Sequence, residues 1–361
     1  MNKCLIWGTG KKAEQNFKKY LLASLDKYVE IIGFIDNDPE KYNECFHGIK
    51  IYKPSDIGEL DYHFIDIWVI KEYEEIKSQI YVMDIPNKRI ASIFQYFIQK
   101  VINRYIYTSD DEIKSFLSIM KQKNELCVYA YTPVNKEEIR EAYYDQEEEL
   151  YYVWFEGKRL YLARNYGFTV NNGKKYVSNL WQEQDLNSPH LYEENEIIVK
   201  EGDVLVDVGV REGNFSLHNI DKVKKLYLIE CDLNWMEALK ATFKPYSDKV
   251  IFCNQYISAY DTATTTTLNT LVQEPVDFLK MDIEGEEINA LIGSDKMFAA
   301  SENIKCSICC YHRHDDENKI KKILQQYGLN TSTSRGYMLF IYDDEVWKEP
   351  ELRRGVVRGK K

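Results

Sequence analysis

One stretch constrains this chain more than any other: residues 203–216, with the sequence Asp-Val-Leu-Val-Asp-Val-Gly-Val-Arg-Glu-Gly-Asn-Phe-Ser. Apolar, β-branched residues come first, two glycines follow four positions apart, and a helical pattern starts at Asn214. This order predicts a strand, a tight turn and the beginning of a helix. Such a turn leaves backbone N–H groups free at the helix N-terminus, and Gly209 and Gly213 let a ligand approach closely because they lack a Cβ. The stretch therefore predicts a site for a small ligand, of which a nucleoside is the expected type.

The chain as a whole has the composition of a globular protein with about two domains. Of its 361 residues, 44% are hydrophobic and 29% charged. No apolar run reaches the roughly 18 residues that a membrane span needs. The formal net charge of −11 opposes binding to nucleic acid, which requires clustered Lys and Arg. We expect a cytoplasmic protein with a solvated basic tail at residues 353–361; a homo-oligomer is compatible with the sequence.

Eight cysteines are scattered along the chain, several of them in apolar runs, such as Cys4, Cys127 and Cys253. These positions suit buried, reduced thiols better than a disulfide framework. Residues 306–314, Cys-Ser-Ile-Cys-Cys-Tyr-His-Arg-His, contain Cys-x-x-Cys spacing, but on a strand Cys309 faces away from its even-numbered neighbours. Because no second cysteine pair follows at zinc-finger spacing, no structural zinc is predicted.

The first 105 residues have the pattern of a small parallel sheet with a glycine turn. Gly8-x-Gly10-x-x-Ala13, followed by Asp36, matches the dinucleotide-binding fingerprint loosely. Together with residues 32–39 and 48–54, this region resembles the Rossmann-like modules that precede catalytic domains in bacterial glycan-modifying proteins. The resemblance implies a nucleotide or sugar-nucleotide site at Gly8, Gly10 and Asp36, or a docking domain. A structural domain without a ligand is the alternative.

Residues 106–195 are expected to form a connector. An amphipathic helix is predicted at residues 111–121 and a β-hairpin at 151–162. The polar stretch 183–192 suits either solvent exposure or a loop that closes over the bound ligand. The second hypothesis assigns contacts with the cofactor or the substrate to five side chains: Glu183, Gln184, Ser188, His190 and Tyr192.

Residues 196–361 alternate between strand and helix patterns, which predicts a second α/β domain. The strand at 225–229 ends at Glu230, where a carboxylate can accept hydrogen bonds from both hydroxyls of an unphosphorylated ribose. Dinucleotide sites have a middle glycine that lets a pyrophosphate touch the backbone, and Arg211 occupies that position. The remaining features fit S-adenosylmethionine (SAM), which has a ribose, an adenine and an amino-acid tail but no phosphate. Asp207 would then lie near the ligand's amino group or a bridging water.

Three runs resemble the FkbM family of SAM-dependent methyltransferases: residues 207–216, 227–232 and 276–286, the last reading Val-Asp-Phe-Leu-Lys-Met-Asp-Ile-Glu-Gly-Glu. The similarity spans roughly residues 150–345. It implies a class I methyltransferase fold and transfer to oxygen, often a sugar hydroxyl in glycan biosynthesis. A threonine run at 262–267 replaces the expected acceptor-side loop, so that loop supports no inference about the substrate. The expected cofactor contacts are Asp207, Gly209, Gly213, Asn214, Glu230, Cys231 and Asn254.

The acceptor side is expected at the carboxyl ends of the next strands. Asp282 and Glu284 follow one of them and His312 ends another, at the sheet edge where ligands bind. A sugar hydroxyl is too weakly acidic to ionise at neutral pH, so a general base should assist. We expect Asp282 or His312 as the base and Glu284 as the residue that orients the acceptor. A divalent metal held by Asp282 and its neighbours is the minor alternative, and none is predicted.

The sequence thus predicts an α/β protein: a Rossmann-like class I methyltransferase sheet at residues 196–361, a separate N-terminal Rossmann-like domain at 1–105, and a helical and hairpin connector at 106–195. The expected cofactor is SAM, and the expected partner is a small-molecule or glycan acceptor. Two other functions stay open. One is an NAD-dependent oxidoreductase that uses the N-terminal module, and the other is a non-catalytic glycan-binding protein with a methyltransferase fold.

Overall fold

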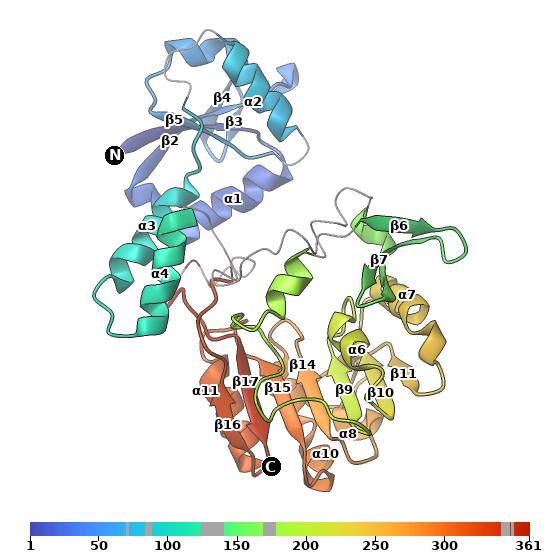
Figure 1. Cartoon of the computed structure of the whole chain (residues 1–361). Coiled ribbons are helices and arrows are strands. Elements are labelled where there is room, and N and C mark those ends of the chain that lie inside the picture. Colours follow the sequence, from blue (N-terminus) through green and yellow to red (C-terminus); the bar gives the residue numbers. More distant parts are fainter. Residues whose placement is uncertain (70–71, 84–88, 124–140, 169–177, 341–346, 348–349) are drawn as a thin grey trace. The chain divides into compact units, whose positions relative to one another are not determined.

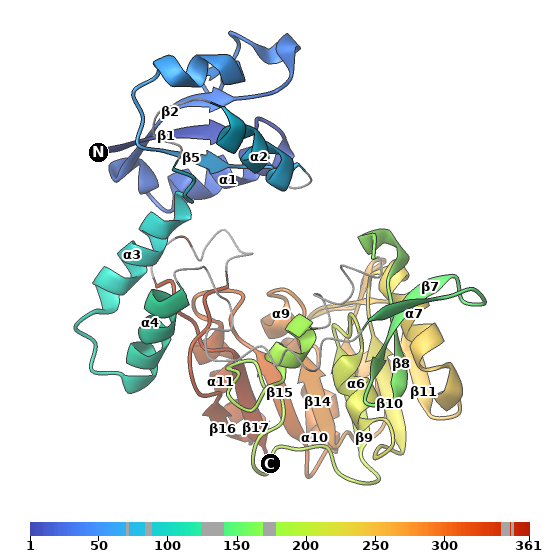
Figure 2. The ribbon, with the colours of Figure 1, turned by 45° about the horizontal axis from the view of Figure 1, so that its top comes forward.

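A computed structural model describes residues 1–69, 72–83, 89–123, 141–168, 178–340, 347 and 350–361. Among these, no helix combines the length and the apolar character that a membrane crossing demands. The chain divides into two compact units, shown in Figures 1 and 2. Unit 1 comprises Met1–Cys127 and Ile341–Glu351, and unit 2 comprises Val128–Phe340 and Leu352–Lys361.

Unit 1 contains a five-stranded sheet in the order β3-β4-β2-β1-β5. Its strands are β1 (Asn2–Trp7), β2 (Val29–Ile35), β3 (Cys45–Phe46), β4 (Ile49–Tyr52) and β5 (Phe64–Ile67). Its helices are α1 (Lys11–Leu22), α2 (Tyr73–Val82), α3 (Phe94–Tyr105) and α4 (Asp111–Lys123). The pairings are parallel, as the sequence predicts, except that the short β3 runs antiparallel to β4. The predicted amphipathic helix at 111–121 is α4.

A residue from near the C-terminus belongs to unit 1. The buried ring of Trp347 packs against Phe97 of α3 at 4.6 Å and against Phe94 at 5.3 Å between ring centroids. Glu351 is also buried, and its carboxylate lies 3.5 Å from Nε of Arg104. The last part of the chain therefore contributes an aromatic side chain and a charge to the core of the N-terminal unit.

Unit 2 contains a seven-stranded sheet in the order β11-β10-β9-β14-β15-β17-β16. Its strands are β9 (Val204–Val208), β10 (Lys225–Ile229), β11 (Val250–Cys253), β14 (Phe278–Met281), β15 (Lys305–Cys309), β16 (Asn330–Thr333) and β17 (Val356–Lys360). All pairings are parallel except those of β17, which runs antiparallel to both of its neighbours. The chain moves outward from β9 to β11 and then returns to place β14 beside β9. The reversal makes the β9–β14 boundary the switch point, where ligands bind in sheets of this kind.

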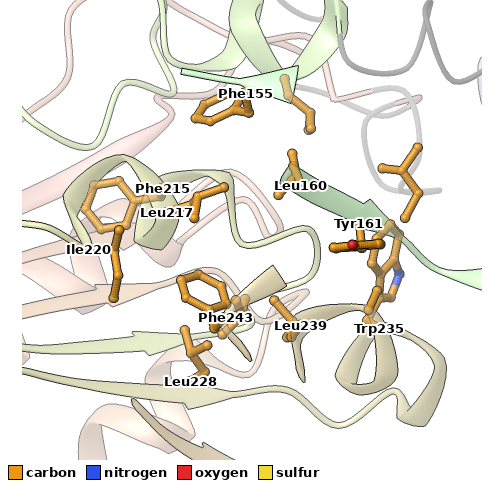
Figure 3. Close-up of a cluster of buried hydrophobic side chains, with 14 of the residues drawn as sticks. Phe155, Leu160, Tyr161, Phe215, Leu217, Ile220, Leu228, Trp235, Leu239 and Phe243 are labelled. Atoms are coloured by element: carbon orange, nitrogen blue, oxygen red, sulfur yellow. The ribbon is translucent and has the colours of Figure 1, made fainter. Parts of the chain in front are cut away.

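Helices cover both faces of this sheet, which explains why every residue of β9 is buried. Leu205 faces a cluster formed with α6 (Asn214–Asn219), α7 (Leu233–Thr242) and the hairpin strands. Figure 3 shows side chains of this cluster, among them Phe215, Leu160 and Trp235. The alternate residues of β9 face a second cluster, which includes side chains from these helices: α8 (Leu268–Leu271), α9 (Glu287–Ile292), α10 (Asp295–Ala300) and α11 (Asp316–Gln326).

Two smaller sheets complete unit 2. The predicted hairpin is formed by β7 (Leu150–Phe155) and β8 (Lys158–Leu162), and β6 (Ala142–Asp145) adds a third strand to it. Strands β12 (Tyr256–Ile257) and β13 (Thr265–Thr266) form a short parallel pair, of which β13 lies in the threonine run.

The C-terminal tail differs from the expectation of a solvated basic segment. Residues 356–360 form β17, which inserts between β15 and β16, and Val356 and Val357 are fully buried. On its outer side β17 pairs with β16, and Met338 forms an isolated bridge with Arg353. The tail is buried because its two valines complete the core while its arginines find internal acceptors.

The cysteines agree in part with the prediction of buried thiols. Cys4, Cys306, Cys309 and Cys310 are buried and free, Cys253 is half-buried, and Cys127 lies outside the described residues. Cys306 and Cys310 belong to one hydrophobic cluster and Cys309 to the other, which confirms that they face opposite sides of the sheet.

Candidate active site

The two sequence runs expected to form the site meet at the switch point. The backbone N–H of Asp282 donates to the carbonyl of Val208 at 2.9 Å, so the end of β14 lies against the turn that follows β9. Gly209 has a φ of +73°, and a Cβ there would lie 1.8 Å from the carbonyl oxygen of Asp282. A Cβ on Gly213, at φ +81°, would lie 2.7 Å from Leu239 of α7. Both glycines are therefore required by packing within the chain, and not only by ligand approach as the sequence suggested.

Asp207 is held by a buried ion pair. Its Oδ1 lies 3.0 Å from Nζ of Lys280, and its Oδ2 accepts a hydrogen bond from Ser216 Oγ at 2.7 Å. Lys280 also donates to the carbonyl of Gly209 at 2.7 Å. Burial opposes the charge of Lys280, but Asp207 and Asp282 outweigh it and raise its pKa. Asp207 thus stabilises the glycine turn through Lys280, which binds the carbonyl of Gly209. Lys280 was missed by sequence reasoning, although a lysine inside an apolar strand signals a buried partner.

The surroundings of Glu230 fit the adenosine of SAM. The two carboxylate oxygens of Glu230 accept the backbone N–H groups of Arg211 and Asp232, each at 2.8 Å. A carboxylate oxygen can accept two hydrogen bonds, so Glu230 can also accept from the hydroxyls of a ribose. Asn254 donates to the carbonyls of Glu230 at 2.8 Å and Cys231 at 3.1 Å, so the expected adenosine residues lie together. Asn214 is the first residue of α6, directly after Gly213.

Asp282 is the centre of a cluster of hydrogen-bonding side chains. Its carboxylate accepts from the hydroxyls of Tyr192 at 3.0 Å and Tyr311 at 3.1 Å. The Nε2 atoms of His190 and His312 lie 3.3 Å and 3.4 Å from it. The side chain of Asp282 is 19% exposed, whereas both imidazoles are almost fully buried. Asp282 therefore has the most exposed side chain of this cluster.

The charges of this cluster are set by its contacts. Burial opposes ionisation of Asp282, but the hydrogen bond from His190 and the charges of His312 and Lys280 outweigh it and hold its pKa well below the usual range. Burial likewise opposes a charge on His312, but Glu287, 3.0 Å from Nδ1, raises the pKa of His312 to about 9. At neutral pH the pair is thus a carboxylate beside an imidazolium.

The stretch 183–192 is exposed at Leu186 and buried from Ser188 onward. Its contact with a cofactor or a substrate stays a prediction. Ser188, His190 and Tyr192 are buried. Gln184 donates to the carbonyl of His190 at 3.3 Å and accepts the N–H of Tyr192 at 3.1 Å. Ser188 Oγ accepts the N–H of His190 at 3.1 Å. His190 and Tyr192 reach Asp282, Gln184 and Ser188 shape the loop that places them there, and Glu183 is half-buried.

Glu284 lies apart from the buried cluster. Because β14 ends at Met281, the chain has already turned, and Glu284 has a φ of +56° and a side chain that is 70% exposed. Its carboxylate lies 3.7 Å from Nε2 of His312 and 3.8 Å from Nη1 of Arg211. Asp282 and Glu284 therefore do not share a face, but Glu284 stays at the rim of the site.

The cluster also has donor sets that a metal ion could use. The ligand atoms of His190, Asp282 and Cys309 lie within 4.8 Å of one another, as do those of Asp282, Glu287 and His312. Mixed nitrogen, oxygen and sulfur donors suit Zn²⁺ better than Mg²⁺, which prefers oxygen. In this structure Asp282 accepts hydrogen bonds from the hydroxyls of Tyr192 and Tyr311. The hydrogen-bonded carboxylate is accordingly the simpler account of these contacts.

At the expected nucleotide site of unit 1, the protein's own donors bind the carboxylate of Asp36. Asp36 accepts hydrogen bonds from the hydroxyl of Thr9, from Lys41 Nζ at 3.0 Å and from the N–H of Asp38 at 3.0 Å. A Cβ on Gly8 would lie 2.7 Å from a methyl group of Val69, so this glycine is required by packing. Gly10 has open space around it and caps α1.

The order of the strands, the acid after β10 and the acid after β14 at the switch point define a SAM-dependent methyltransferase with a Rossmann-like sheet. The chain belongs to the FkbM methyltransferase family: residues 151–337, more than half of the chain, match the model of the methyltransferase FkbM domain. Residues 1–91 match a second model, described as C2185-like, N-terminal. No curated protein is similar enough to the chain to count as a relative.

Solved structures are similar at low sequence identity. The methyltransferase FkbM from Methylobacillus flagellatus KT is 13% identical, with 99% of this chain and 90% of that chain covered and a TM-score of 0.43. TYW2 from M. jannaschii, solved in complex with AdoMet, is 14% identical, with 58% and 84% covered and a TM-score of 0.33. The precorrin-6y C5,15-methyltransferase from Geobacter metallireducens GS-15 is 12% identical, with 45% and 81% covered and a TM-score of 0.32.

Proposed function

We propose that the protein transfers the methyl group of SAM to a hydroxyl oxygen of a sugar in glycan biosynthesis. The observation that supports this most directly is the partly exposed side chain of Asp282, which lies at the switch point beside the glycine turn. The choice of a sugar rests on the FkbM resemblance, and the net charge of −11 opposes a nucleic-acid acceptor.

SAM supplies an already activated methyl group on a sulfonium, so the protein's task is to position the acceptor and to take its proton. In the reaction the carbon–sulfur bond breaks with its electron pair going to sulfur, an oxygen–carbon bond forms, and the hydroxyl proton leaves. His312 is already protonated at neutral pH, which favours Asp282 as the group that receives the acceptor's hydrogen bond. Asp282 is a weak base, but the hydroxyl becomes strongly acidic as its oxygen gains the methyl group. A weakly basic, correctly placed carboxylate is then sufficient.

The remaining residues of the site have supporting roles in this proposal. Tyr192 and Tyr311 hold the Asp282 carboxylate in one orientation through their hydroxyls. Glu284, at the rim, orients the acceptor. Asp207 and Glu230 lie on the cofactor side with Gly209, Gly213, Asn214, Cys231 and Asn254.

The proposal is tested by the production of S-adenosylhomocysteine (SAH) from SAM with a panel of sugar nucleotides and oligosaccharides. Asp282→Asn should reduce turnover by at least about 100-fold while SAM affinity, measured by calorimetry, stays within about twofold. Asp221→Asn is the matched control, because Asp221 is exposed and pairs only with Lys158 among the described contacts. Binding of SAM without SAH formation on any acceptor would instead favour a non-catalytic glycan-binding protein. Loss of turnover with EDTA, restored by a divalent ion, would favour the metal alternative.

We also propose that unit 1 has a nucleotide site at Gly8, Gly10 and Asp36. This proposal is separate from the first, and it keeps the predicted division of the chain into a domain at residues 1–105, a connector at 106–195 and a second domain at 196–361. It is tested by calorimetry of the full chain with NAD and with a UDP-sugar, alongside Asp36→Asn. Binding that the variant loses would support the site. An absence of heat with both ligands would leave the module with a structural or docking role, and would also count against an NAD-dependent oxidoreductase.

A further inference from the structure

The C-terminal segment, residues 352–361, is built into the active site of unit 2. Arg358 on β17 is 3% exposed. Its guanidinium donates to the carbonyl of Leu191 at 2.5 Å and to that of Tyr192 at 3.3 Å. A third hydrogen bond, of 2.6 Å, reaches the carboxylate of Glu194. The rigid fork of one arginine thus fixes the backbone of the loop that places Tyr192 on Asp282.

A second arginine fixes the other segment beside Asp282. Arg353 is buried, and its Nη1 donates to the carbonyl oxygens of both Tyr311 and His312 at 2.7 Å. Strand β15 ends at Cys309, so no strand pairing holds these two carbonyls. Arg353 therefore donates the hydrogen bonds to the two backbone carbonyls that follow the end of β15.

Between the two arginines, the tail touches the same two segments directly. A Cβ on Gly355 would lie 2.0 Å from the carbonyl oxygen of Pro189, so only glycine fits. The carbonyl of Gly355 accepts the N–H of Cys310 at 2.9 Å. Residues 353–358 consequently contact both the loop at 188–192 and the segment at 310–312.

We propose that Arg353 and Arg358 are positioning residues for methyl transfer. They act through backbone carbonyls to hold the four side chains that surround Asp282: His190, Tyr192, Tyr311 and His312. We call Arg353 and Arg358 together the arginine clamp. The match to the FkbM model ends at residue 337, so the clamp lies outside the part of the chain that the family resemblance identifies. The inference rests on the proposed function, in which Asp282 receives the acceptor hydroxyl.

The test compares Arg353→Lys and Arg358→Lys with Arg354→Lys. A lysine keeps the charge, but it has no planar fork and its nitrogen lies one bond closer to the backbone than Nη of arginine. It therefore cannot reach the two carbonyls and the carboxylate that Arg358 contacts, and it falls short of the carbonyls that Nη1 of Arg353 reaches. Arg354 is the matched control, because it lies between the two arginines in sequence but donates to Gly336 and stacks on Tyr337. Two of the readouts need no acceptor: SAH affinity by calorimetry, and the imidazole C–H signals in a carbon–proton NMR spectrum, where the chain has only six histidines.

Both clamp variants should bind SAH within about twofold of the wild type, because Asp207 and Glu230 make no described contact with the tail. Arg353→Lys should shift the signal of His312, Arg358→Lys should shift that of His190, and Arg354→Lys should shift neither. Once an acceptor that the protein methylates has been found, kcat for it should be about 100-fold lower in the clamp variants, because small displacements in an active site have effects of this size. Unchanged histidine signals, or SAH affinity and turnover lost in equal proportion, would overturn the clamp.

The outcomes separate this inference from the proposed function. Shifted histidine signals with intact SAH binding, but no methylated sugar, would support the clamp and contradict the acceptor. A methylated sugar together with full turnover in both clamp variants would support the proposed acceptor and contradict the clamp. Hydrogen exchange on the unmodified protein covers the case in which a variant does not fold. Residues 188–192, 310–312 and 353–358 should then exchange as one unit, and a tail that exchanges much faster than the other two would contradict the clamp.

Discussion

At the scale of single residues, the site depends on which groups keep a proton. Asp282 stays ionised because its partners outweigh its burial, while His312 stays protonated because of Glu287. Glu287 is fully buried and also accepts the N–H of Ile283 at 2.8 Å. It therefore supports the charge of the imidazole from a fixed position. Sequence inspection left Asp282 and His312 as candidates for the base, and this contact is the reason why we propose Asp282.

Glu287→Gln should lower the pKa of His312 from about 9 toward its ordinary value of 6.5, because the negative charge beside Nδ1 is lost. The measurement is the pH titration of the His312 imidazole signal by NMR. Glu286→Gln is the control, since Glu286 is half-exposed and pairs with Arg313. A midpoint that does not move in Glu287→Gln would refute the assigned cause.

The same pKa predicts a dependence of stability on pH. The pKa of His312 is higher in the folded state, so its contribution to the free energy of unfolding is complete below about pH 6.5 and is lost as the pH rises through about 9. Urea unfolding at pH 6.5 and at pH 9.5 should therefore show a smaller decrease in His312→Gln than in the wild type. Equal decreases in the two proteins would contradict the assignment.

Lys280 and Asp207 form the buried pair beneath the glycine turn. Lys280→Met leaves a buried carboxylate without its cation and should lower the free energy of unfolding by about 3–5 kcal/mol. Lys224→Met should change it by less than about 0.5 kcal/mol, since Lys224 is exposed and lies 3.9 Å from its partner Asp277. Urea unfolding measures both. Adding Asp207→Asn to Lys280→Met should recover part of the loss, and a double variant that is less stable than Lys280→Met would count against the pair.

At the scale of elements, the contact between the β9 turn and the end of β14 determines the geometry of the site. Gly209→Ala would place a Cβ 1.8 Å from the carbonyl of Asp282 and should abolish SAM binding by pushing the two strand ends apart. Gly202→Ala is the matched control: its φ of +80° is similar but its surroundings are open. The control should lose only about 1–2 kcal/mol of stability and keep its affinity for SAM in calorimetry. Equal effects of the two substitutions would show that backbone conformation, and not the close approach, makes Gly209 necessary.

At the scale of the whole molecule, the chain consists of two units whose cores are built from separate sets of side chains. The proposed SAM site lies in unit 2, so SAH should raise the unfolding transition of that unit, by about 2.7 kcal/mol at 100 times its Kd. Trp347→Ala removes a large side chain from the core of unit 1 and should lower the other transition by about 3–5 kcal/mol. Scanning calorimetry with and without SAH tests both. A single transition that responds to ligand and substitution alike would show that the units unfold together.

The sequence by itself determined the features that depend on local pattern. Alternating apolar residues and paired glycines predicted β9, its turn and α6, and the hairpin followed from two short strands around Gly157. Glu230 was found because an acid at the end of a second strand is a fixed distance from the turn in such sheets. The FkbM resemblance likewise rests on contiguous runs, and the match over residues 151–337 confirms it.

Only the tertiary structure decided what those residues are surrounded by. Asp282 gathers Tyr192 and Tyr311, which lie 90 and 29 positions away in the chain, and no periodicity encodes such a meeting. The C-terminal tail was predicted to be solvated because its sequence is short and basic. In the structure its strand, β17, lies between β15 and β16 in the sheet. Strand order and burial are set by the packing of the whole unit, so the functions of Lys280, Arg353 and Arg358 became visible only when their buried partners were known.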